Sequence, residues 1–231
     1  MNNANLNSGE NTRTNLAGKS GVDSVYAITG MTGGTTDGEE IVVKIDEIRT
    51  LTGNTPTATG SMYSWNQKNG TKASTTGNMT GVYDMSGGIW EKTASYIANE
   101  NVNMINYGKS MTYEGDILKT TSTKYTMVYP HNSDIDNKDI DNTLENLATA
   151  SIANYNLNTK IYGDGIREVS TSGLDATTWK GEYSHFIGLY GSFMYRSGAF
   201  WDSSYTGILA FHRDGGYSNF GHGFRPVVIP I

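Results

Sequence analysis

The stretch from Tyr183 to Ile231 constrains the fold most strongly, because glycines divide it into short aromatic runs. All six phenylalanines of the chain lie in this stretch. Apolar and aromatic residues predict strands at 192–195, 208–211 and 224–229, with glycine turns between them. Leucine and glutamate, which favour helices, are scarce. We therefore expect a loop-rich α+β fold with short antiparallel strands and few helices.

Other elements are predicted upstream. The β-branched run at 40–45 and the run at 124–129, which ends at a proline, predict strands. Residues 52–80 are rich in Thr, Gly and Asn and predict a loop. Apolar residues recur at helical spacing over 142–155, which predicts a helix with Asp141 as its N-cap.

Length and composition predict one domain. Residues 1–20 are polar and predict a flexible lead-in, and residues 21–231 predict a single domain. The net charge is −6 with no basic stripe, which argues against nucleic-acid binding. The absence of cysteine excludes disulfides, thiolate metal sites and cysteine-based catalysis.

Membrane and export signals are also missing from the sequence. No apolar run reaches the roughly 18 residues that a membrane span needs. Met1 leads into polar residues, so no signal peptide is predicted, and an exported protein would use another machinery or a segment that has been removed. The polar composition favours an extracellular, cell-surface or virion-borne protein.

An acidic segment from Asp134 to Asn142 partly resembles a calcium-binding loop. Lys138 at the fifth ligand position and Asp139 in place of the required glycine argue against an EF-hand. We expect a solvated acidic loop that caps the following helix and no cofactor, although a looser calcium site stays open. Asp202 and Asp214 could act as glycosidase carboxylates only at a separation of about 5–10 Å, so no catalytic residue is assigned.

Three segments together resemble a known family. Gly81–Glu91 reads G-V-Y-D-M-S-G-G-I-W-E, Tyr195–Trp201 reads Y-R-S-G-A-F-W, and Gly223–Arg225 reads G-F-R. They are similar, in order and wide spacing, to motifs of formylglycine-generating-enzyme-like domains, which have a C-type lectin fold. The departures are Gly88 for asparagine and Ser197 for glycine. The resemblance covers 75–231 and implies a C-type lectin-like fold.

The resemblance implies a shared fold but not the catalytic activity of the family's enzymes. By residue type, Trp90 is expected to be a buried anchor, and Asp84 and Glu91 are expected to accept hydrogen bonds from loop amides or to pair with Arg196 or Arg225. The family's enzymes need cysteine or a histidine-ligated iron. This chain has no cysteine, and its four histidines show no H-x3-H pattern. We therefore expect a protein that is not an enzyme.

A second branch of the same fold fits the C-terminal composition better. The chain resembles the variable proteins of diversity-generating retroelements and lectin-like surface and prophage proteins of Gram-positive bacteria. In the variable proteins, mutagenesis at adenines diversifies residues near the C-terminus that bind changing receptors. The region implied here is about 196–225. Its candidate contact residues are Ala199, Phe200, Asp202, Ser203, Ser204, Tyr205, His212, Asp214, Tyr217, Ser218, Asn219 and His222, with Trp201 as a fixed stacking ring.

These residue types suit recognition, because aromatic rings give contact area at low entropy cost and small polar groups give adaptable hydrogen bonds. The sequence therefore predicts a non-catalytic protein that binds a protein receptor or a surface glycan through a diversified aromatic and polar surface. The alternative is a structural or assembly subunit of a pilus or virion that uses the same surface for subunit contacts. The oligomeric state is left open.

Overall fold

The computed structural model describes a large C-terminal part of the chain and short pieces upstream. The described residues are 33–34, 40–41, 48–51, 60–63, 80, 90–179, 181–198, 207–219 and 221–224. The chain divides into two units. The first comprises Met1–Trp90, Ser197–Ala210 and Phe220–Gly223, and the second comprises Glu91–Arg196, Phe211–Asn219 and Phe224–Ile231. The predicted lead-in at 1–20 lies outside the described residues.

In the first unit, the described N-terminal strands form two short antiparallel pairs. Strand β1 (Gly33–Gly34) pairs with β2 (Glu40–Ile41), which begins where the strand at 40–45 was predicted. Strand β3 (Ile48–Leu51) pairs with β4 (Gly60–Tyr63). The prediction of a loop throughout 52–80 is therefore wrong at β4. The Thr/Gly/Asn composition around β4 does not reveal its pairing with β3, which supplies the backbone hydrogen bonds of a strand.

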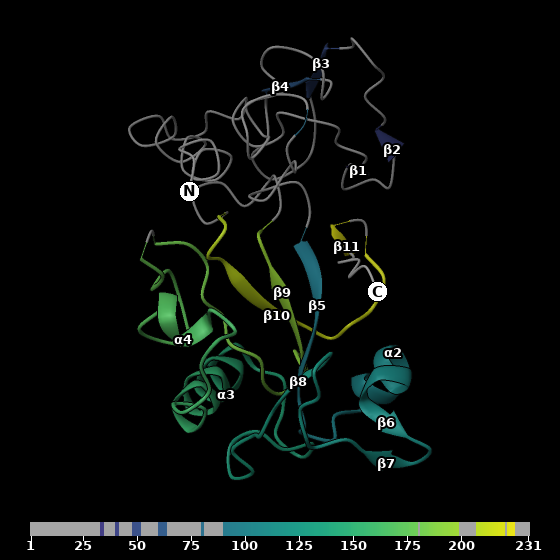
Figure 1. Cartoon of the computed structure of the whole chain (residues 1–231), viewed down its shortest axis with the longest axis vertical. Coiled ribbons are helices and arrows are strands. Elements are labelled where there is room, and N and C mark those ends of the chain that lie inside the picture. Colours follow the sequence, from purple (N-terminus) through teal and green to yellow (C-terminus); the bar gives the residue numbers. More distant parts are fainter. Residues whose placement is uncertain are drawn as a thin grey trace. The chain divides into compact units, whose positions relative to one another are not determined.

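The longest of the described strands, β5 (Trp90–Ile97), is central to a five-stranded sheet. The strand order is β10-β9-β5-β11, and β8 pairs with β5 in parallel (Figure 1). The other bounds are β8 Met127–Tyr129, β9 Phe193–Arg196, β10 Phe211–Asp214 and β11 His222–Phe224. Both β9 pairings are antiparallel. The fold is α+β with short strands and few helices, and β8 is an exception to the expected antiparallel pairing.

The predicted C-terminal strands are confirmed to different extents. Strand β9 coincides with the prediction at 192–195 apart from a shift of its ends. Strand β10 begins at the last residue of the predicted strand 208–211, because Gly207 to Ala210 form a turn in which the Ala210 amide donates to the Gly207 carbonyl at 3.0 Å. Strand β11 overlaps the prediction at 224–229 only at Phe224, and residues 225–231 lie outside the described residues.

Helix α3 (Leu144–Leu157) confirms the helix predicted over 142–155, but its N-cap is Thr143 and not Asp141. The Thr143 side chain accepts a hydrogen bond from the Asn146 amide, as an N-cap residue does. Asp141 lies two residues earlier and accepts from the Thr143 amide instead. Two helices were not predicted, α2 (Val102–Thr112) and α4 (Ile166–Val169).

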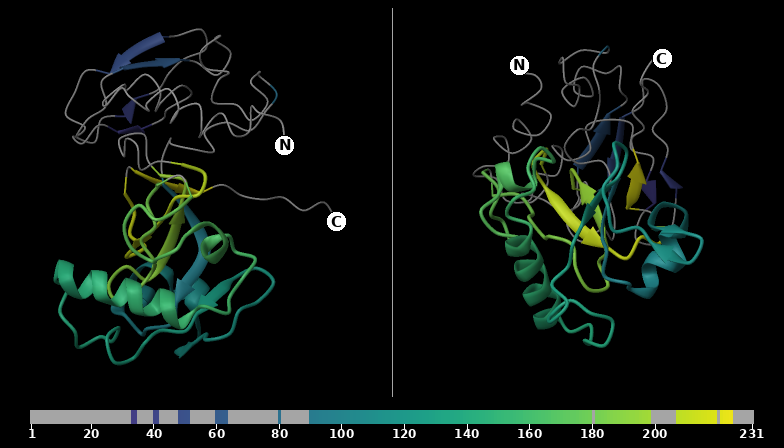
Figure 2. Two further views of the ribbon diagram at one scale, coloured as in Figure 1. Left: turned by 90° about the vertical axis from the view of Figure 1, so that its left-hand side faces the viewer. Right: turned by 60° about the horizontal axis from the view of Figure 1, so that its bottom comes forward.

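Helices α2 and α3 lie on opposite faces of the sheet in the second unit (Figures 1 and 2). The α3 face carries an apolar core whose largest members are fully buried. This core comprises Ile97, Tyr129, Tyr155, Ile166, Phe186, Ile187, Met194 and Phe211. Tyr155 of α3 contacts the Phe186 ring edge-on, with 5.7 Å between ring centroids. Burial of these large side chains is the main stabilising contribution to this unit.

The α2 face is packed more locally. Phe193 of β9 lies against Gly108 of α2, and a Cβ atom built at Gly108 would lie 2.4 Å from its ring. Glycine is therefore required for helix and strand to approach this closely. Beyond the C-terminal end of α2, the chain forms a two-stranded hairpin of β6 (Tyr113–Glu114) and β7 (Ile117–Leu118). Among the described residues, the buried apolar cluster lies on the α3 face.

A buried polar cluster joins four segments of the second unit. The Asp136 carboxylate is fully buried and accepts from the Asn99 and Asn154 side-chain amides, at 3.1 and 2.6 Å, and from the Leu189 amide. The interpretation of 134–142 as a solvated loop is therefore wrong at Asp136, although Asp134 and Asp139 are exposed. The carboxylate is buried because N–H donors from three segments satisfy it.

Candidate functional site

The candidate site lies on the face of the sheet that also carries Phe193. The register places Lys92 of β5, Tyr195 of β9 and His212 of β10 directly opposite one another across three strands. Side chains on neighbouring strands in register share a face, so these three form one row. Asp214 follows His212 by two residues and lies on the same face. The neighbouring residues Met194 and Phe211 point to the α3 core.

Tyr195 and Asp214 form the polar centre of this face. The Tyr195 hydroxyl donates to Asp214 Oδ1 at 3.1 Å, and the Gly216 amide donates to the same oxygen at 2.9 Å. Burial and the negative charge of Asp214 raise the pKa of Tyr195, so the hydroxyl stays protonated and acts as a donor. These bonds hold the turn that follows β10 against the sheet.

Lys92 fixes the same turn from the other side. Its Nζ donates to the carbonyl oxygens of Gly216 and Tyr217 at 2.7 and 3.0 Å. It also lies 5.9 Å from the centroid of the Tyr195 ring, within the range of a cation–π interaction. Lys92 was not predicted as a site residue, because only the strand register reveals that it lies beside Tyr195.

Tyr217 is the exposed aromatic residue of this turn, with 41% of its surface accessible. Its ring meets that of Tyr107 on α2 edge-on, with 6.0 Å between centroids. Ser218 is exposed and Asn219 is half-buried. An exposed ring held by a neighbouring ring and by bonds to its backbone loses little entropy when it binds a partner.

His212 belongs to a cluster of three rings. It stacks on His185, with 4.9 Å between centroids and an interplanar angle of 29°, and Tyr183 contacts both rings edge-on. Backbone bonds from the Phe211 amide to the Tyr183 carbonyl and from the His185 amide to the Phe211 carbonyl hold 183–185 beside β10. Burial, assisted by the charge of Arg213, lowers the pKa of His185 to about 4, so this ring is neutral near pH 7.

The structure brings together only part of the predicted surface. His212, Asp214, Tyr217, Ser218 and Asn219 lie on β10 and its following turn. His222 is half-buried on β11, in the first unit. The others lie outside the described residues: Ala199, Phe200, Trp201, Asp202, Ser203, Ser204 and Tyr205.

Some scaffold residues of the predicted motifs are described. Trp90 is 7% exposed, which confirms it as a buried residue, and its amide donates to the Gly221 carbonyl at 2.9 Å. Glu91 stands opposite Arg196 in the β5–β9 register. Burial lowers the pKa of Arg196, and the nearby carboxylate of Asp164 opposes this effect. Asp84 and Arg225 lie outside the described residues.

The surroundings of the acidic and histidine side chains bear on whether the protein could bind a metal ion or catalyse a reaction. Among the described residues, no three His, Asp or Glu side chains are grouped as a metal ion would need. The Asp136 oxygens accept hydrogen bonds from amides, which gives this acidic residue a structural role. Asp214 likewise accepts from Tyr195 and Gly216. The other carboxylate considered for such a role, Asp202, lies outside the described residues.

Comparison with known proteins gives no match: no family model, curated protein or solved structure is similar to the chain. None of the helices in the described part of the chain combines the length and the apolar character that crossing a membrane requires. The function is therefore inferred from the residues and geometry of the chain itself.

Proposed function

We propose that the chain is a non-catalytic binding protein with a C-type lectin-like fold, and that residues 196–225 contact a protein receptor or a surface glycan. The proposal includes diversification of this region, as in the variable proteins of diversity-generating retroelements. It places the protein outside the cell, on the cell surface or on a virion. The sequence resemblance suggests the class, and the geometry of the second unit supports it.

The observation that carries the proposal is the anchored, exposed Tyr217, which follows β10, the strand that carries His212 and Asp214. Five of the residues proposed to vary thus lie on β10 and the turn that follows it, supported by side chains outside the variable set. Tyr195, Lys92 and Tyr107 supply this support. A rigid frame beneath changeable contact residues is what a diversified binding surface needs.

Backbone geometry at the second motif also supports the resemblance. Ser197 stands where the related motif has glycine, and its φ is +82°. Gly198 follows with a φ of +94°. Glycine adopts such angles at little cost, whereas other residues do so only rarely. A glycine in the related motif would therefore suit the backbone of this turn.

A subunit of a pilus or virion is the second candidate, and exposed apolar side chains favour it. Trp179 is 72% exposed and Leu144 is 86% exposed. An obligate assembly would bury such residues in a large interface, whereas a receptor-binding protein would leave the surface around Tyr217 accessible in the free state. Sedimentation of the purified chain distinguishes the two, because an assembly subunit would form large oligomers.

The proposed function is tested with Tyr217→Ala. The variant should lose binding to surface glycans, on a glycan array, or to intact Gram-positive cells, because the exposed ring provides contact area. Its free energy of unfolding should change by less than about 1 kcal/mol, since the ring is half outside the core. Tyr162→Ala, at a 69% exposed tyrosine on another segment, is the matched control and should bind normally.

Unchanged binding by the Tyr217→Ala variant would contradict the assignment of this surface. A large loss of stability would show that Tyr217 is a core residue, which would also contradict it. If the wild-type chain binds none of these targets and sediments as a large assembly, the second candidate function replaces the first.

A further inference from the structure

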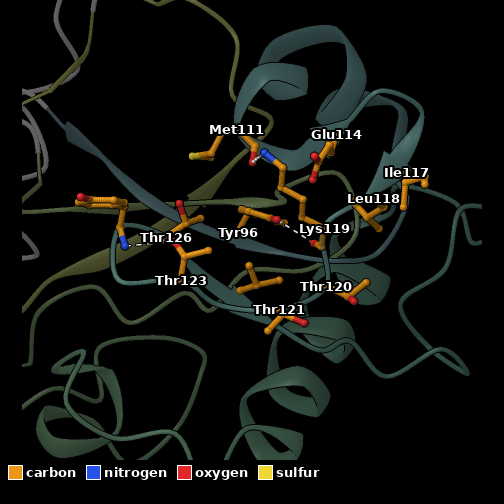
Figure 3. A pocket seen from close by; sticks show the side chains of 12 residues that line it. Tyr96, Met111, Glu114, Ile117, Leu118, Lys119, Thr120, Thr121, Thr123 and Thr126 are labelled. Atoms are coloured by element: carbon orange, nitrogen blue, oxygen red, sulfur yellow. Dashed lines mark hydrogen bonds between the residues drawn. The ribbon is translucent and has the colours of Figure 1, made fainter.

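A pocket of about 470 Å³ lies in the second unit, on the α2 face of the sheet (Figure 3). Tyr96 of β5 and Val128 of β8 stand opposite each other in the register and form its floor. The end of α2 and the β6–β7 hairpin form one wall. The segment from Thr120 to Thr126 forms the other. This volume is within the range of small-molecule sites, about 300–1,000 Å³.

The interior of the pocket is mainly apolar. Met111, Leu118 and Ile117 contribute side chains beside the buried floor. The Tyr96 hydroxyl donates to the Lys119 carbonyl at 2.7 Å, so this polar group is satisfied within the fully buried floor. An apolar interior of this kind favours a ligand with an aliphatic or aromatic body.

Hydroxyl groups line the opposite wall. Thr120, Thr121, Thr123 and Thr126 follow one another along this segment, and Figure 3 shows them around the pocket. The Thr123 hydroxyl accepts from the amides of Tyr125 and Thr126, both at 3.1 Å, which fixes the turn. Tyr125 is 70% exposed beside the pocket and could cover part of a ligand.

Two opposite charges stand at the hairpin wall. Glu114 pairs with Ile117 in the hairpin register, and the Lys119 amide donates to the Thr112 carbonyl at 2.8 Å, so Glu114 and Lys119 flank the same turn. Within the described part of the chain, neither forms an ion pair. Lys119 Nζ donates to the Met111 carbonyl at 3.3 Å. Both charged groups can therefore take a ligand of opposite charge without breaking a salt bridge.

We propose that this pocket binds a free amino acid or dipeptide with an apolar side chain. The ligand carboxylate pairs with Lys119 and the ligand ammonium group pairs with Glu114. The apolar side chain lies above the buried floor, against Met111, Ile117 and Leu118. A neutral saccharide fits less well, because it would leave both charges without partners and would meet an apolar floor. The site is separate from the surface around Tyr217 and does not depend on the proposed function.

Isothermal titration calorimetry with L-leucyl-L-leucine as the probe tests the proposal. N-acetyl-L-leucine amide, which keeps the side chain but has neither charge, is the matched probe and should bind at least about tenfold more weakly. Maltose is the saccharide probe and should not bind. Equal binding of the charged and uncharged leucine probes, binding of maltose alone, or no binding of any probe would overturn the proposal.

Single substitutions test whether Lys119 and Glu114 contact the charged groups of the ligand. Lys119→Met and Glu114→Gln should each weaken dipeptide binding about tenfold while leaving the weak binding of the uncharged probe unchanged. The control is the double variant Lys109→Met, Asp116→Asn. It removes an exposed ion pair between α2 and the hairpin turn, in which Lys109 Nζ lies 3.1 Å from Asp116 Oδ1. This control should bind the dipeptide normally, and a loss equal to that of Lys119→Met would overturn the assignment.

Blocking the pocket provides a test that does not depend on charge. Thr121→Trp introduces a large ring at an exposed position in the wall and should abolish binding of both leucine probes. Circular dichroism checks that each variant keeps the wild-type spectrum. Full dipeptide binding by a folded Thr121→Trp variant would show that the ligand lies elsewhere and would contradict the proposal.

Discussion

The two faces of the sheet in the second unit use the same strands for different purposes. On the α3 face, Met194 and Phe211 belong to a continuous buried core. On the α2 face, their neighbours Tyr195 and His212 belong to a row of polar and aromatic side chains. Alternate residues of a strand point to opposite faces, so one short sequence supplies both the core and the candidate binding surface.

The comparison shows that burial alone does not separate scaffold from site. Tyr195 is 1% exposed, yet its hydroxyl positions Asp214 on the candidate surface. Asp136 is also a buried side chain with hydrogen-bonding atoms, but its hydrogen bonds join four buried segments of the chain. A buried polar group can therefore support either the candidate surface or the core, and mutations on each side of the sheet test this contrast.

The largest expected effect is at Phe211, on the α3 face. Phe211→Ala should lower the free energy of unfolding by about 3–5 kcal/mol, because the ring is fully buried in the core. His212→Ala, one residue later on the opposite face, should cost only about 1 kcal/mol, the scale of its ring contacts. Urea denaturation of both variants measures the difference. Similar losses would contradict the contrast between the faces.

A slightly smaller effect is expected at Asp136. Asp136→Ala leaves two amide side chains and a backbone amide without their acceptor, and should cost about 3 kcal/mol. Asp134→Ala, at an exposed position two residues earlier, should change stability by less than about 0.5 kcal/mol. Thermal unfolding of the pair checks this, and tolerance of Asp136→Ala would show that the cluster is not structural.

His185 should make stability depend on pH. Its pKa is lowered from 6.5 in the unfolded chain to about 4 in the fold. The unfolded chain therefore binds more protons below pH 6.5, so stability should fall as the pH drops from 6.5 to 4. Because the ring is half-buried, we expect a loss of about 1–2 kcal/mol. Urea unfolding of wild type and His185→Phe at pH 7 and pH 4.5 should show a smaller loss in the variant, and equal losses would contradict this role.

The smallest expected effect is a gain at the turn that follows β9. Ser197→Gly should stabilise the protein by about 0.5–1 kcal/mol, because glycine relieves the positive φ of +82°. Thermal unfolding measures the gain. Ser197→Ala is the control and should bring no gain, since alanine is as restricted as serine at this angle. A loss on glycine substitution would show that the serine side chain contributes more than the strain costs.

Much of the α+β character could be predicted from the sequence, because short aromatic runs and glycine turns are local signals. The strands near 40, 125 and 193 and helix α3 were predicted within a few residues. Helix α2 was missed because it contains Gly108 and several residues with low helix propensity, and its stability depends on packing against Phe193. The N-cap was misplaced because Asp141 and Thr143 are both suitable residue types.

The candidate site could be predicted only in part. Tyr217 and His212 stand out by composition, but the support from Lys92 depends on a pairing between residues more than a hundred positions apart. The pocket was missed for the same reason. Its floor, hairpin wall and threonine wall come from separate segments whose proximity no local pattern indicates.

The central claim is that a diversified surface lies near the C-terminus, and sequencing the encoding locus across a population tests it most directly. The account predicts substitutions concentrated at adenines in codons between Ala199 and His222, with Trp201, Gly207 and Arg225 unchanged, together with the core codons of Phe211 and Asp136. A uniform locus, or substitutions spread evenly over core and surface codons, would contradict it.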